Sequence, residues 1–400
     1  MTDPVTAPTP APTPAPMTAP MTASVPPPPP PPAAARRARR RDRRVYLRSH
    51  PLLFALLAAT RRRPVVRLGR TVLVHGTEAY REALTQVPLD RTAPGTTGGA
   101  AAELTVGGLL FDQDGAEHRS ARRALAGGLD TAAQQRIRPH WQAVLATRIP
   151  DLAAGELEIV SLARELAGVT AAALTGAQSC PHRLAHAAAE AAAHAARDHL
   201  PGLRRRGPDA VAATVAAAAR LAALLPDAPD APDAPDARDA RDARDAMVAV
   251  AAVNTTVAAL PRAVAWCSDA GLWPTVSETT APRLAAELLR LTAPSPLLPR
   301  VAAADTTLAG HPVRAGDRLV LVARHAARAH RRGPADDPAA TQAVFGAGPH
   351  ACPGAGLARA LLADLLLALA PHHPVVTRAR VDRRSALPGY AELTVRRGRS

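Results

Sequence analysis

The chain has 400 residues, enough for one large domain or two modest ones. Its three cysteines, Cys180, Cys267 and Cys352, lie far apart without a Cys-x-x-Cys pair, which argues against a disulfide framework and a structural zinc site. The formal net charge is +15, but only 2% of the residues are aromatic, without the basic–aromatic interleaving that favours single-stranded nucleic acid. We therefore expect no nucleic-acid partner.

The N-terminal segment is predicted to be a tail. Residues 1 to about 35 are Pro, Ala and Thr repeats that cannot bury apolar surface, so we expect disorder or polyproline helix. Residues 36–44 hold seven arginines and one aspartate, which we interpret as solvated. The predicted tail covers residues 1–44 and the folded domain 45–400. No signal peptide is visible, and the apolar run 51–59 is too short to span a bilayer, so we expect a cytoplasmic protein that does not bind membranes.

The sequence patterns between residues 65 and 246 predict strands, helices and loops in turn. Residues 65–75 alternate, which predicts a hairpin of short strands, and residues 77–85 read as a helix. The loop 88–107 has few large side chains, and residues 151–225 read as several alanine-rich helices. The repeat 227–246 has a period of three, and proline at every third residue forbids helix in its first half. We predict an exposed low-complexity loop there.

An apolar, buried helix is expected at 247–259. It contains Ala251-Ala-Val-Asn254-Thr255-Thr, and Pro261 should kink or end it. Further on, Glu287-Leu-Leu-Arg290 places two opposite charges on one helix face, and a strand pattern follows at 307–322. Trp266 and Trp273 are expected in the core.

The most specific feature is the run from Phe345 to Arg359, which reads F-x-x-G-x-H-x-C-x-G-x-x-L-A-R around Cys352. Gly348 permits a tight turn before the cysteine, because glycine reaches backbone conformations that other residues avoid. Gly354 lets the next helix start close to the sulfur, where its N–H groups stabilise negative charge. A lone cysteine is often a structural thiol or half of a disulfide, but this pattern favours a reactive thiolate.

This run resembles the haem-thiolate loop of the cytochrome P-450 superfamily at every defining position. Three further segments match that family's motifs in the expected order: His118-Arg-Ser-Ala-Arg122, Ala251–Thr256 in part, and Glu287-Leu-Leu-Arg290. The resemblance covers roughly residue 45 to the end and implies a mainly α fold with a small β subdomain. It implies heme b (iron protoporphyrin IX) with Cys352 as the iron ligand. The other residues implied to bind the cofactor are Phe345, Gly354, His350, His118, Arg122 and Arg300, of which the two histidines and two arginines are implied to contact the propionates.

The sequence departs from the family pattern at two places. Alanine replaces a glycine at 252, and Asn254 stands where the family has an acid that relays protons to the catalytic Thr255. Asparagine can donate hydrogen bonds but does not titrate near neutral pH. The segment between Arg324 and Phe345 is shortened and lacks the family's usual Asn-Arg-Asp-Pro, so the third member of the Glu287–Arg290 network stays unassigned, with Arg331 and Arg332 as candidates. Drift from aspartate is the alternative to a selected role for Asn254.

The function implied by the resemblance is a monooxygenase that inserts one oxygen atom of O2 into a small apolar or secondary-metabolite substrate, bordered by Leu297 and Leu298. The chain has no flavin, nucleotide or iron–sulfur motif. The implied partners are therefore an acidic ferredoxin and a ferredoxin reductase, and the protein is expected to be a monomer. Two alternatives remain open: a non-oxygenating or peroxide-using haem-thiolate enzyme, and a degenerate member that binds haem or a ligand without turnover.

Overall fold

The computed structural model describes residues 32–96, 98–99, 115–199, 208–226, 235–331 and 338–398. The predicted proline-rich tail and most of the second half of the loop 88–107 lie outside these residues. The helices are α1 (Pro32–Ser49), α2 (Pro51–Thr60), α3 (Thr77–Thr85), α5 (Gly115–Ala126), α6 (Thr131–Arg148), α7 (Asp151–Ala154), α8 (Ile159–Thr175), α9 (Pro181–His199), α10 (Pro208–Ala222), α11 (Pro235–Ala270), α12 (Ala281–Thr292), α13 (Ala323–Ala326), α14 (Pro338–Gln342) and α15 (Ala355–Leu369).

The strands form one mixed sheet and two smaller antiparallel ones. They are β1 (Val65–Leu68), β2 (Thr71–Val74), β3 (Leu89–Asp90), β4 (Glu156–Glu158), β5 (Leu298–Ala302), β6 (Thr306–Leu308), β7 (His311–Val313), β8 (Arg318–Leu321), β9 (Val375–Asp382) and β10 (Gly389–Arg396). The largest sheet has the order β1-β2-β8-β5-β3, with β2 and β8 parallel. The others are β4-β10-β9 and the hairpin β6-β7. The hairpin predicted at 65–75 is confirmed as β1–β2, with Val65 opposite Val74.

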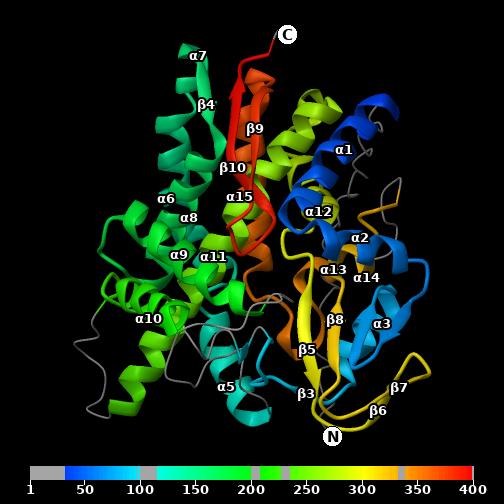
Figure 1. The fold of residues 1–400 in the computed structure, drawn as a ribbon. Helices are drawn as coiled ribbons and strands as arrows, with labels where there is room; N and C mark the ends of the chain where they lie inside the picture. Colours follow the sequence, from blue (N-terminus) through cyan, green and yellow to red (C-terminus); the bar gives the residue numbers. More distant parts are fainter. Residues whose placement is uncertain are drawn as a thin grey trace, which may run out of the picture.

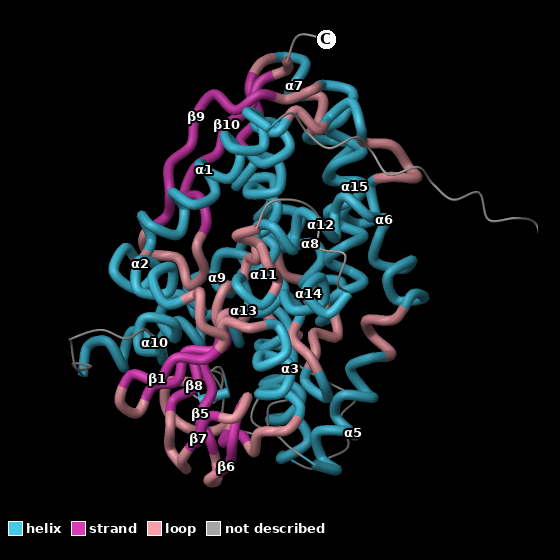
Figure 2. The backbone as a smooth tube through the Cα atoms, turned by 90° about the vertical axis from the view of Figure 1, so that its right-hand side faces the viewer, coloured by secondary structure: helices cyan, strands magenta, loops and turns pink. Residues whose placement is uncertain are grey.

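The molecule is mainly helical, with its strands gathered at two ends. Figure 1 shows α6, α8, α9 and α10 on one side and the sheet that contains β5 and β8 on the other. Figure 2 shows β9 and β10 at the end opposite that sheet. The largest core cluster joins α6, α8, α11, α12 and α15, and it includes Trp141, Trp266 and Trp273, the last two as predicted. The predicted fold class, mainly α with a small β subdomain, is confirmed.

The structure corrects the predicted N-terminal boundary. Residues 32–44, which we interpreted as a solvated tail, belong to α1. Ala38, Asp42, Val45 and Tyr46 are buried on one face of this helix, because the spacing i, i+4, i+7, i+8 places them on the same side. Because arginines occupy most of the positions between these four residues, the buried face is difficult to recognise from the sequence. The folded domain therefore begins at least thirteen residues earlier than predicted, since α1 starts at Pro32.

The structure also corrects the predicted loop 227–246. Helix α11 begins at Pro235, so the second half of the repeat is helical and continues into the apolar segment. The first half, 227–234, lies outside the described residues. Pro261 does not end the helix, which continues to Ala270. Proline removes one backbone donor, but buried side chains such as Leu260, Ala263 and Val264 hold this stretch in the core.

Two described helical stretches, Arg241–Ala270 and Ala355–His372, are long and apolar enough by composition to cross a membrane. Both are packed against other helices of this fold: α11 against α8 and α1, and α15 against α12 and α6. Their apolar character is that of central core helices.

Candidate active site

The cysteine loop connects two short 3-10 turns to α15. The turns are Ala343–Phe345 and Gly348–His350, and α15 begins at Ala355. The Cys352 N–H donates to the Phe345 carbonyl at 2.6 Å, and the Ala351 N–H donates to the Gly348 carbonyl at 3.1 Å. These bonds fold the backbone tightly around the sulfur, as the motif predicts.

Two glycines shape this loop. Gly348 has φ of +68°, which glycine adopts at little cost, and a Cβ there would lie 2.9 Å from Cγ2 of Thr85 on α3. A Cβ at Gly354 would lie 3.9 Å from the Cys352 sulfur, on the flank of the thiol. The predicted role of both glycines thus has a geometric basis: one permits the turn and the other keeps the start of α15 clear beside the sulfur.

The Cys352 side chain is exposed, whereas Leu357 one turn later is buried. The protein packed around the thiol raises its pKa, while the Gly354 N–H and the Arg122 and Arg359 guanidinium groups act in the opposite direction. The Gly354 N–H and the two guanidinium groups therefore stabilise the thiolate form of Cys352. Arg359 also lies over the Phe345 ring, 4.7 Å from its centroid, and so links the first and last residues of the motif.

The predicted propionate contacts come together from separate elements. His118 on α5 is buried and stacks on His350 of the cysteine loop, with ring centroids 3.7 Å apart and an interplanar angle of 26°. Arg122 lies one turn after His118 on α5, and the charge of its guanidinium acts to lower the pKa of Cys352. The i, i+4 pair on α5 therefore lies beside the cysteine loop, as the resemblance implies.

Arg300 on β5 adds a further cation. Burial and, after it, the charge of the neighbouring Arg91 guanidinium together lower its pKa to about 10, against the opposing effect of Tyr80. Arg91 lies just after β3, which pairs with β5. Sequence reasoning missed Arg91, since only the strand pairing brings these two arginines together.

This donor set fits the haem group. An exposed thiol can supply the axial ligand, and the two histidines with Arg91, Arg122 and Arg300 supply hydrogen-bond donors suited to two carboxylates. Arg91 and Arg300 are half-buried like charges that raise each other's energy, which contributes to the lowered pKa of Arg300, and an anionic group beside them would relieve this repulsion.

The Glu287–Arg290 pair forms as predicted. Arg290 is fully buried and donates from Nε and Nη2 to the two carboxylate oxygens of Glu287 at 2.7 and 2.5 Å. Its Nη1 donates to the Ala327 carbonyl at 2.8 Å. Of the two candidates for a third member, Arg331 is exposed and Arg332 lies outside the described residues.

The two predicted catalytic residues lie within α11. Thr255 is exposed between buried Val253 and Ala258, and its hydroxyl donates to the Ala251 carbonyl at 2.8 Å. Asn254 donates from Nδ2 to the Val250 carbonyl at 2.8 Å and to the Ala188 carbonyl of α9 at 3.4 Å. The amide of Asn254 is thus used as a donor that joins two helices, a contact that a carboxylate cannot make.

One apolar groove lies elsewhere. It has a volume of about 500 Å³ and is lined by α6 and α15 residues together with His372. It contains none of the predicted site residues, so we place the candidate active site at the cysteine loop.

Solved structures with this architecture are numerous. Cytochrome P-450 BioI in complex with an acyl carrier protein ligated to hexadec-9Z-enoic acid matches with a TM-score of 0.70 and 17% identity over 88% of this chain and 99% of that one. CYP109E1 from Bacillus megaterium, in complex with testosterone, matches with a TM-score of 0.67 and 18% identity, covering 89% of this chain and 100% of that one. A mutant of P-450 EryK in complex with erythromycin B matches with a TM-score of 0.64 and 20% identity, covering 88% of this chain and 97% of that one.

No protein-family model matches the sequence, and no curated protein matches it. At these identities the structural likeness establishes the fold. The chain has the cytochrome P-450 fold, as the cysteine motif predicts.

Proposed function

We propose that this protein is a haem-thiolate monooxygenase that inserts one oxygen atom of O2 into a small apolar or secondary-metabolite substrate. The main support is the cysteine loop, in which an exposed thiol lies near the Arg122 guanidinium of α5 and the Arg359 guanidinium of α15, within the cytochrome P-450 fold. Cys352 would supply the thiolate that holds the haem iron, and haem, when bound, would supply the chemistry of oxygen activation. His118, Arg122, Arg300 and His350 would hold its propionates.

The protein residues have distinct roles in this proposal. Cys352 would hold the iron as a thiolate, and the Gly354 N–H and the nearby Arg122 guanidinium would stabilise its negative charge. Thr255 offers the exposed hydroxyl on the central helix. Asn254 orders α11 against α9 but holds no titratable proton, so protons would reach the site through water or substrate.

Electrons would come from an acidic ferredoxin and its reductase, in keeping with the net charge of +15. A substrate carried on another protein or a bulky natural product would accord with the ligands named for the similar structures. We further propose that the protein works as a cytoplasmic monomer.

The first test is the absorption spectrum of the dithionite-reduced protein with carbon monoxide, for wild type and Cys352→Ser. We expect the red-shifted Soret band of thiolate ligation in wild type and its loss in the variant. The matched control is Cys180→Ser, because Cys180 is exposed and lies far along the chain from the motif. A wild-type protein that binds no haem, or an unchanged spectrum in Cys352→Ser, would contradict the proposal.

The second candidate is a haem protein that does not insert oxygen, favoured by Asn254 in place of an acid. Product formation with ferredoxin and reductase supplied separates the two. Hydroxylated product supports the monooxygenase, whereas haem binding with electron consumption and no oxygenated product supports the alternative.

A further inference from the structure

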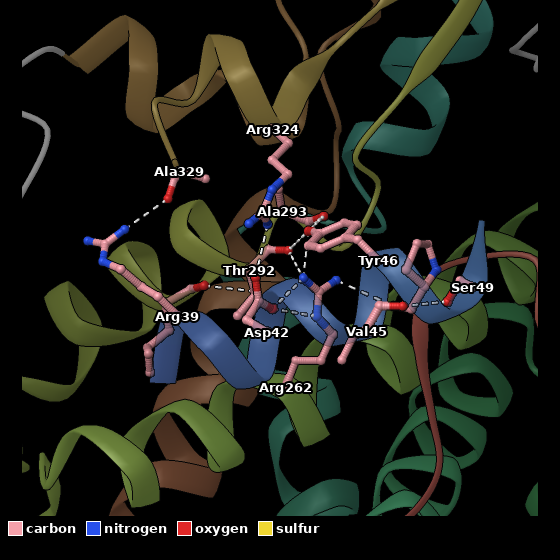
Figure 3. A network of polar contacts seen from close by, with 12 residues as sticks. Arg39, Asp42, Val45, Tyr46, Ser49, Arg262, Thr292, Ala293, Arg324 and Ala329 are labelled. Carbon is pink, nitrogen blue, oxygen red and sulfur yellow. Dashed lines mark hydrogen bonds and ion pairs between the residues drawn. The ribbon is translucent and has the colours of Figure 1, made fainter. Parts of the chain in front are cut away.

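Helix α1 reaches the segment that follows α13. Arg39 donates from Nη1 to the Ala329 carbonyl at 3.1 Å, and Arg324 on α13 donates from Nη1 to Asp42 at 3.0 Å. Figure 3 shows both contacts, with Arg39 and Asp42 projecting from α1. From the opposite side, Arg290 of α12 holds the Ala327 carbonyl. Residues 324–329 are therefore fixed between α1 and α12.

Asp42 is the centre of a buried network. It is only 4% exposed and accepts from Nε and Nη2 of Arg262 on α11 at 3.0 and 2.6 Å, in addition to Arg324. The guanidinium groups of Arg262 and Arg324 lie 4.5 and 3.9 Å from the ring centroid of Tyr46. Removing the carboxylate would leave two buried or half-buried cations without this anion, which is costly in a protein interior.

The α1 contacts extend to the end of α12. The Tyr46 hydroxyl donates to the Thr292 carbonyl and to the Ala293 carbonyl, the latter at 3.0 Å (Figure 3). Next to Asp42 in the same helix, Arg41 anchors α1 on α11, because it donates to both carboxylate oxygens of Asp269 at 2.5 and 3.1 Å. One helix thus connects α11, α12 and α13.

Arg39 also lies within electrostatic reach of the Glu287–Arg290 pair. Burial lowers its pKa, as do the charges of Arg290 and Arg324, while Glu287 acts in the opposite direction. The guanidinium of Arg39 is therefore a cation close enough to the Glu287–Arg290 pair to interact with both of its charges.

We propose that Arg39 and Asp42 are positioning residues for the Cys352 loop. In this role α1 supplies an arginine to the Glu287–Arg290 network from outside the shortened segment, for which the sequence left Arg331 and Arg332 as candidates. The inference rests on the proposed haem-thiolate function.

The path from α1 to the cysteine is short. Ala323, Ala326 and Ala327 pack in the same buried cluster as Ala343, which opens the turn Ala343–Phe345. The Phe345 carbonyl accepts the Cys352 N–H. Displacement of the α13 segment is therefore passed to the backbone that holds the sulfur.

Three variants and one control variant of the full-length protein test this role. Arg39→Gln removes the charge and the contact to Ala329, and Arg39→Lys keeps the charge. Arg40→Gln is the matched control, because Arg40 is the next residue of α1 and is exposed. Asp42→Asn gives a second, independent change to the network.

Two measurements are made on each variant. Hydrogen exchange of the haem-free protein follows the amides of residues 327, 328, 329 and 331, which donate to carbonyls of the same segment. Reduced carbon monoxide spectra of the haem-loaded protein give the fraction of thiolate-ligated haem, at a temperature where circular dichroism shows the fold intact. For Arg39→Gln we expect exchange faster by about tenfold, the effect of losing one charge-assisted hydrogen bond, and a lower thiolate fraction.

We expect the thiolate fraction to be the same in Arg40→Gln as in wild type. It should be intermediate in Arg39→Lys and lowest in Arg39→Gln and Asp42→Asn. Wild-type exchange and wild-type thiolate fraction in Arg39→Gln would overturn the inference. If wild type binds no haem, the proposed function fails, and the exchange comparison alone still decides whether α1 fixes the α13 segment.

Discussion

At the scale of single residues, Asn254 is the most informative departure. Its Nδ2 donates to two backbone carbonyls, Val250 and Ala188, so it has a structural use that a carboxylate lacks. An aspartate at this position would face two oxygens and must turn toward another neighbour, at a cost of about 1–3 kcal/mol in the free energy of unfolding. Once turned, it could relay protons.

We therefore expect Asn254→Asp to lower the thermal midpoint while raising substrate turnover, by up to about 10²-fold if proton delivery limits the rate. Turnover and the ratio of product formed to electrons consumed would be measured with supplied ferredoxin and reductase. Asn254→Ala is the control, because it loses the same hydrogen bonds without gaining a titratable group. Equal turnover and coupling in wild type and Asn254→Asp would remove the idea that Asn254 alters oxygen activation.

The residues of the cysteine loop could be predicted from sequence because their chemistry demands fixed local spacing. Phe345, His350, Cys352 and Gly354 lie within one short stretch, and the structure folds them around one sulfur. Arg91 could not be found in this way, since its approach to Arg300 depends on the pairing of β3 with β5.

At the scale of elements, α3 and the cysteine loop pack closely at Gly348. Gly348 has φ of +68°, and a Cβ at this position would lie 2.9 Å from Cγ2 of Thr85. The Gly348→Ala substitution therefore introduces both backbone strain and a steric clash. We expect a loss of about 1–3 kcal/mol in the free energy of unfolding from strain, with a further loss from the contact. Urea unfolding and haem content are the measurements.

Gly69→Ala separates the two effects. Gly69 has a similar φ of +60° in the β1–β2 turn, and a Cβ there meets nothing within 4 Å. This control should show the strain alone and leave haem content unchanged. If both alanine variants lose equal stability and both keep their haem, the contact with α3 does not shape the loop.

The prediction of helices and strands succeeded where the apolar residues followed a clear helical or strand period. It failed where many charged residues made that period difficult to recognise. The helix at Thr77–Thr85 and the hairpin before it match their patterns. In α1 the buried stripe of Ala38, Asp42 and Val45 is narrow and lies among arginines, so charge outweighed periodicity. The single aspartate in the arginine run was the available signal, because its carboxylate bonds Arg262 and Arg324.

At the scale of the whole molecule, the parallel pairing of β2 with β8 brings distant segments together, and sequence patterns alone do not give such a pairing. It places His75, just after β2, against His325 of α13, with Nδ1 atoms 2.9 Å apart. The His330 ring lies 5.2 Å from that of His325. Three histidines thus share one buried site.

These histidines make global stability depend on pH. Burial lowers the pKa of His75 to about 4 and that of His330 to about 4, and burial with the charges of His75 and His330 lowers that of His325 to about 2. Arg61, Arg324 and Arg331 face the cluster and add to the effect. An unfolded histidine titrates near 6.5, so between that pH and about 4 the unfolded chain binds more protons than the folded protein.

The free energy of unfolding should therefore fall as the pH is lowered from about 6.5 toward 4, and change little from this source above 7. Urea unfolding at several pH values measures this slope. His330→Gln should make the slope shallower, because it removes one group that must remain neutral in the fold, whereas His311→Gln, in the exposed β6–β7 hairpin, should keep the wild-type slope. Coincident slopes for wild type and His330→Gln would mean that other groups govern the acid limit of this fold.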